Sequence, residues 1–165
     1  MRVKRSVFII SVVILSLAVG QPLAGGTQHK HKSKAKHPTA TKAAAAHYVA
    51  IVGPSNVTIT NVNGEIKADG RTLSGTELAS QLNPAVRALT TLSEKLTTYR
   101  WPRKSQRDVR SLVSDLGSLM DAMSTAGTVN ALNASQWLTT LGSDERATAT
   151  ASNLVRHDLG LPTAT

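Results

Sequence analysis

The stretch that decides the fold runs from Thr76 to Met123 and reads TELASQLNPAVRALTTLSEKLTTYRWPRKSQRDVRSLVSDLGSLMDAM. Apolar residues recur in it at alternating steps of three and four, which is typical of helices with one apolar face. These positions are Leu78, Leu82, Ala85, Leu89, Leu92, Leu96 and Tyr99, then Val109, Leu112, Leu116, Leu119 and Met123. Because Pro102 interrupts a continuous helix, the stretch predicts two helices that fold back as an antiparallel pair.

Local signals suggest where these two helices begin and end. Ser74-Gly75-Thr76-Glu77 has the Ser-x-x-Glu form of a capping box, which predicts a helix start. Asn83-Pro84 then favours a break, with the main helix over 84–99, because proline inside a helix costs about 3 kcal/mol. One helix kinked near residue 80 is the alternative. The second helix is expected to begin at Pro102 and to end near Ser124.

Two more segments complete the expected bundle. Residues 44–70 carry a similar stripe and predict a first helix, kinked or broken at Pro54. A hairpin over 57–67 is the alternative, because Asn63-Gly64 is a turn signal, although a lone two-stranded hairpin is marginal. A last helix is expected over 133–159, with a possible break at Gly142-Ser143 and a stop at Gly160. The fold class is therefore all-α, an antiparallel bundle of about four helices over residues 44–165.

Composition narrows the range of functions. The chain has 165 residues and no cysteine, which excludes disulfides, thiolate metal sites and cysteine nucleophiles. Phe, Tyr and Trp together number five, so we do not expect aromatic-rich ligand pockets or base-stacking platforms. The net charge is +9, but from residue 48 onward 11 basic residues face 10 acidic ones. A nearly neutral helical body is not typical of a specific nucleic-acid-binding domain.

The first 24 residues read as a secretory signal peptide. Arg2-Val3-Lys4-Arg5 is a positive start, and an apolar run over 7–19 is followed by small residues that suit cleavage after Gly20 or Ala24. An uncleaved anchor is the alternative, but the run is shorter than the roughly 20 residues that span a bilayer. We therefore expect an exported protein, secreted or associated with the cell envelope.

Residues 25–43 form a Lys/His-rich linker that is expected to be disordered, because like charges repel and apolar periodicity is lacking. One interpretation is a tether to an anionic envelope polymer or lipid surface, and the other is a solvated spacer. The candidate anion-binding residues are Lys30, Lys32, Lys34, Lys36 and Lys42. His29, His31 and His37 are candidate metal ligands, but the neighbouring lysines repel a cation.

One corner of the helical body could contact a protein partner. Its residues are Arg100, Trp101, Arg103 and Arg107. The alternative is a solvated helix start, with Trp101 packing over the end of the helical hairpin. The chain carries no recognisable catalytic motif, and the neighbours His157 and Asp158 would point about 100° apart on a helix. We therefore expect no enzymatic activity and no cofactor.

Three motifs resemble those of a loose group of exported helical proteins from high-GC Gram-positive bacteria. They are Trp101-Pro102, the run VRHDLGLP over 155–162, and the run YVAIVGPSN over 48–56. The resemblance covers residues 48–162 and implies a helical first segment, but it supplies no activity. Many members of the group are lipoproteins, and this chain departs from them because it lacks cysteine.

Together these features predict a non-enzymatic cell-envelope binding or interaction module on a basic linker. The alternative is a carrier of a small ligand or metal, which would use the bundle interior or the histidines of the linker. The sequence does not identify the ligand, the partner or the oligomeric state.

Overall fold

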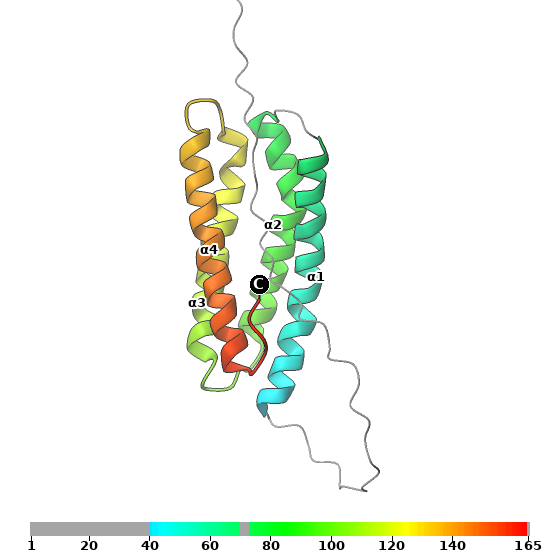
Figure 1. Cartoon of the computed structure of the whole chain (residues 1–165), viewed down its shortest axis with the longest axis vertical. Helices are drawn as coiled ribbons and strands as arrows, with labels where there is room; N and C mark the ends of the chain where they lie inside the picture. The colour runs from blue at the N-terminus through cyan, green and yellow to red at the C-terminus, as the bar shows by residue number, and fades with distance from the viewer. Residues whose placement is uncertain (1–39, 70–72, 165) are drawn as a thin grey trace, which may run out of the picture.

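A computed structural model of the chain describes residues 40–69 and 73–164. It contains four long helices, α1 (Ala40–Asp69), α2 (Gly75–Thr98), α3 (Gln106–Ser124) and α4 (Ala134–Asp158), and a short 3₁₀ helix η1 (Thr125–Thr128). The helices alternate in direction (Figure 1). The predicted all-α bundle is confirmed, and the hairpin alternative over 57–67 is wrong because those residues belong to α1.

Consecutive helices pack along one another: α1 on α2, α2 on α3, and α3 on α4. The pair α1 and α4 closes the bundle with fewer close backbone approaches, and the Tyr48 hydroxyl and the Ser152 hydroxyl lie 2.8 Å apart across it. The start of α1, the α2–α3 connection and the end of α4 all lie at one end of the bundle (Figure 1).

The core is aliphatic and centres on the two helices that decide the fold. The leucines of the α2 and α3 stripes are all buried, as predicted, and none is more than 1% exposed. They are Leu78, Leu82, Leu89, Leu92, Leu96, Leu112, Leu116 and Leu119. At about 25 cal/mol for each Å² of buried apolar surface, this set is the main source of stability.

The helix caps follow the predicted chemistry at two ends. At the start of α2, the Glu77 amide donates to the Ser74 hydroxyl and the Ser74 amide donates to the Glu77 carboxylate, which completes the capping box. After α4, Gly160 takes a φ of 71°, and the Leu161 amide donates to the Arg156 carbonyl. This left-handed stop is one that glycine adopts without strain.

The break preferred at Pro84 is wrong, and at Pro54, where a kink or a break was expected, the helix is not broken. Pro54 lies inside α1 and Pro84 inside α2, and both helices continue through them. Each proline leaves one carbonyl four residues earlier without its helical bond. Those carbonyls belong to Ala50 and Ser80, which are exposed, as are both prolines, so water can satisfy them. The free energy gained by burying the apolar stripe on either side of each proline outweighs the cost of the proline itself.

Three other boundaries differ from expectation. α4 runs through Gly142 and Ser143 without a break. α3 begins at Gln106 rather than at Pro102, because residues 102–105 form a turn in which the Ser105 amide donates to the Pro102 carbonyl. α1 begins at Ala40, so the last residues of the expected linker, including Lys42, belong to the first helix.

No helix of the described residues is both long enough and apolar enough to cross a membrane. The predicted signal peptide lies outside the described residues.

We expect Leu89→Ala and Leu112→Ala each to lower the free energy of unfolding by about 2–5 kcal/mol, because each leaves a cavity in the core. Leu132→Ala is the matched control, since Leu132 is 98% exposed and its loss should cost less than about 0.5 kcal/mol. Urea unfolding followed by circular dichroism measures all three. A wild-type midpoint for either core variant would contradict this packing.

Candidate functional site

Exposed basic side chains gather at the end of the bundle where α1 begins and α2 turns into α3. We call this group the basic end, and it consists of Lys42, Arg100, Arg103, Lys104, Arg107 and Arg110. The acidic residues at this end are Asp108 and Asp158, and Asp158 lies 3.1 Å from Lys104. The four arginines make no ion pair with another described residue. The positive charge of these arginines is therefore not paired with a carboxylate of the described residues.

At the opposite end of the bundle, the described residues carry net negative charge. There the described residues at the end of α1, the start of α2 and the end of α3 include four carboxylates and one lysine. They are Glu65, Lys67, Asp69, Glu77 and Asp121. The bundle is nearly neutral in total, but its charge is separated along its length. Such a molecule orients in the field of a charged surface.

An aromatic cluster holds the α2–α3 connection against α1 at the basic end. The Tyr99 ring stacks on His47 of α1 with centroids 3.9 Å apart, and it meets Trp101 edge-on at 4.7 Å. Trp101 also meets the Tyr48 ring edge-on at 6.1 Å. These contacts join the first helix to the α2–α3 connection. Three of the five Phe, Tyr and Trp residues of the chain lie here, which the composition alone did not indicate.

Trp101 has a structural role in this corner. It is 6% exposed, and its indole nitrogen donates to the Leu96 carbonyl at 2.7 Å. The Gln106 amide nitrogen donates to the Trp101 carbonyl at 3.1 Å. This placement matches the interpretation in which Trp101 packs over the end of the hairpin. Of the candidate partner-contact residues, Arg100, Arg103 and Arg107 are the ones exposed to solvent.

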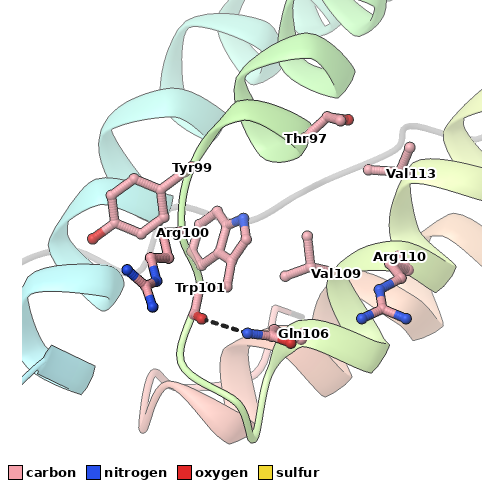
Figure 2. A pocket seen from close by; sticks show the side chains of 8 residues that line it. All are labelled: Thr97, Tyr99, Arg100, Trp101, Gln106, Val109, Arg110 and Val113. Carbon is pink, nitrogen blue, oxygen red and sulfur yellow. Dashed lines mark hydrogen bonds between the residues drawn. The ribbon is translucent and has the colours of Figure 1, made fainter.

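A pocket of about 400 Å³ opens beside Trp101, between the end of α2 and the first turns of α3 (Figure 2). Its apolar walls come from Tyr99, Trp101, Val109 and Val113. Arg100 and Arg110 also line it, on either side of Trp101 in Figure 2. Sequence reasoning singled out Arg100 and Trp101 but missed the lining role of Arg110 and Gln106. Gln106 lies three residues before Val109, and Arg110 lies three residues before Val113. This spacing places them beside the valines on α3 only once the helix start is known.

The remaining candidate residues lie mostly outside this region. Of the linker lysines, Lys42 lies on α1 at the basic end, whereas Lys30, Lys32, Lys34 and Lys36 lie outside the described residues. The candidate metal ligands His29, His31 and His37 also lie outside them. Within the part of the chain that the structure describes, no group of three or more His, Asp or Glu side chains could hold a metal ion.

A second unusual feature lies where α4 faces α1. The Trp137 indole nitrogen donates to the Ala122 carbonyl, so one face of α4 rests on α3. Ser152, which meets Tyr48, marks the face that looks toward α1. This second face is polar: its buried members include Glu145, two turns before Ser152. The apolar residues Ala147 and Leu154 of α4 lie on neither buried face, because both are exposed.

Glu145 is buried without a partner. It is 6% exposed and makes no hydrogen bond or ion pair with another described residue. Two turns along α1 from Tyr48 lies Asn56, whose buried side-chain oxygen also lacks a hydrogen-bond partner. Burial raises the pKa of the Glu145 carboxyl from its ordinary value of 4.5 to about 7, and the neighbouring Arg146 lowers it only in part. Glu145 therefore exchanges its proton near neutral pH.

Compared with protein-family models, with curated proteins and with solved structures, the chain shows no significant match.

The raised pKa of Glu145 predicts a pH-dependent stability. Between about pH 4.5 and pH 7 the folded protein holds a proton that the unfolded chain releases, so the free energy of unfolding falls as the pH rises through this window. Glu145→Gln keeps the shape and removes the titration. We expect it to stabilise the bundle relative to wild type by about 1–3 kcal/mol at pH 8 and by much less at pH 4.5.

Urea unfolding at a series of pH values measures this difference. Glu94→Gln is the matched control, because Glu94 is exposed on α2 and its replacement should leave the pH profile unchanged. Parallel pH profiles for wild type and Glu145→Gln would show that Glu145 does not titrate in this window.

Proposed function

We propose that the protein is an exported, non-enzymatic module that binds anionic components of the cell envelope, such as an acidic polymer or a lipid surface. A signal peptide directs the export. The linker lysines and the basic end act together, and the helical bundle is the rigid body that they hold at the surface. The resemblance of three sequence motifs to those of exported helical proteins from high-GC Gram-positive bacteria supports the export part of this proposal.

The observation that carries the proposal is the location of the basic end. The linker joins the bundle at Ala40, and the exposed arginines of the α2–α3 connection lie at that same end (Figure 1). The two groups of positive charge can therefore meet one surface at the same time. Each basic side chain near an anionic lipid surface contributes about 1 kcal/mol, and several together give stable but salt-sensitive binding.

The charge separation along the bundle supports the same orientation. An anionic surface attracts the basic end and repels the carboxylates at the far end. The bundle would then stand with its α1–α2 and α3–α4 connections away from the surface. Those connections, and the exposed Leu132 within the second, would remain open to solvent or to a protein partner.

The alternative function is a carrier of a small ligand or a metal. The interior is filled by leucines, so a ligand would use the surface pocket beside Trp101 rather than the bundle core. A metal would depend on the linker histidines alone. The pocket is the one observation that favours this alternative.

The proposal predicts that charge at the basic end matters more than charge elsewhere. In cosedimentation of the full chain with vesicles containing phosphatidylglycerol, we expect Arg103→Gln with Arg107→Gln to weaken binding about tenfold. The matched control is Lys67→Gln with Arg87→Gln, which removes the same charge from exposed sites away from that end and should change binding by less than about threefold. Replacing Lys30, Lys32, Lys34 and Lys36 by glutamine should weaken binding further.

Both double variants carry the same net charge, so the comparison separates position from total charge. Equal losses in the two would contradict a surface-facing basic end. Binding that persists in both, or that does not weaken as salt is raised, would contradict electrostatic attachment altogether.

A further inference from the structure

We infer that the pocket beside Trp101 binds a single amphipathic anion, an acidic head group on a short alkyl chain. The pocket lies within the basic end, so this inference deepens the proposed function by naming a ligand class for that end. It differs from surface attachment because it needs one bound molecule rather than a charged surface.

The pocket has the size and the walls of a small-molecule site. Its volume of about 400 Å³ falls in the range of small-ligand pockets, roughly 300–1,000 Å³. The rings of Tyr99 and Trp101 and the branched side chains of Val109 and Val113 form a wall without charge. An alkyl chain that lies on this wall leaves water and gains about 0.8 kcal/mol for each methylene that is fully buried.

The charged groups of the pocket select an anion. Arg100 and Arg110 lie on either side of Trp101, one from the α2–α3 connection and one from the second turn of α3 (Figure 2). Neither guanidinium pairs with a carboxylate among the described residues. A planar guanidinium offers two parallel N–H groups to a carboxylate or phosphate, and this geometry gives strong, oriented binding.

The start of α3 adds to the positive potential. Ser105, which precedes the helix, makes no capping bond with its side chain and instead donates its hydroxyl to the Pro102 carbonyl. Arginines in the first turns of a helix are unfavourable next to the positive end of the helix dipole. Arg107 and Arg110 both occupy such positions, and a bound anion would offset the repulsion.

The floor of the pocket is preformed. Trp101 is held by its bond to the Leu96 carbonyl, by the bond from Gln106 to its own carbonyl, and by the rings of Tyr99 and Tyr48. A rigid wall loses little conformational entropy when a ligand binds, so even a small ligand can bind measurably. Trp101 also lies in the pocket as a natural fluorescent reporter.

The test uses the full chain with Trp137→Phe, because the chain has two tryptophans and this change leaves Trp101 as the only one. The probes are octanoate, octyl phosphate, octanol and octylamine, each titrated while Trp101 fluorescence is recorded. We expect saturable binding of octanoate or octyl phosphate, and binding of octanol and octylamine weaker by at least about tenfold. The stronger of the two anions identifies the head group.

Variants then assign the binding to the two arginines. Arg100→Gln and Arg110→Gln should each weaken anion binding by about fivefold to tenfold. Arg87→Gln is the control, because Arg87 is an exposed arginine of α2 that does not line the pocket. All three sites are exposed, and circular dichroism verifies that the variants fold. Equal binding of octylamine and octanoate, no saturable change, or equal loss in Arg87→Gln would each overturn the inference.

The linker variant separates this inference from the proposed function. Replacing Lys30, Lys32, Lys34 and Lys36 by glutamine should leave octanoate binding within about twofold, because the two arginines and the apolar wall of the pocket belong to the bundle itself. Octanoate binding by a chain that shows no salt-sensitive binding to vesicles would overturn only the proposed surface attachment. Vesicle binding without octanoate binding would overturn only the pocket.

Discussion

The burial of one leucine face on each of α2 and α3 is the constraint on which the rest of the structure depends. These two central helices are joined by the short connection over residues 99–105, and each carries an outer helix, α1 on α2 and α4 on α3. Because the leucines are almost fully buried, the register of the two helices is fixed. That register places Trp101 in the core and leaves the arginines around it in water.

The position of the charge follows from this packing. The connection between the central helices cannot enter the core, so it carries Arg100 and Arg103 to the end of the bundle, and Arg107 follows in the first turn of α3. The stacking of His47 on Tyr99 brings the start of α1, and with it the attachment point of the linker, to the same place. The attachment point of the basic segment and the exposed arginines are separate in the sequence but lie at one end of the bundle, which is the physical basis of the proposed attachment to anionic surfaces.

Periodicity in the sequence predicted the helices and the leucine core, because burial of a stripe outweighs local preferences. It did not settle whether the helices continue through Pro54 and Pro84. There the hydrogen bond lost to proline belongs to the carbonyl of an exposed residue, and this exposure depends on tertiary packing. The exposed arginines of the site were visible in the sequence. The aromatic cluster, the pocket beside Trp101 and buried Glu145 were not, because each depends on which faces of separate helices meet.

The central claim is that the end of the bundle bearing Arg100, Arg103 and Arg107 faces an anionic surface. The chain has no cysteine, so a single one can be placed at Thr98 near this end or at Leu132 near the other, both exposed, and labelled with an environment-sensitive fluorophore. With phosphatidylglycerol vesicles that carry a quencher in the head group, the label at 98 should be quenched and the label at 132 should not. Equal quenching at both positions, or stronger quenching at 132, would contradict the account.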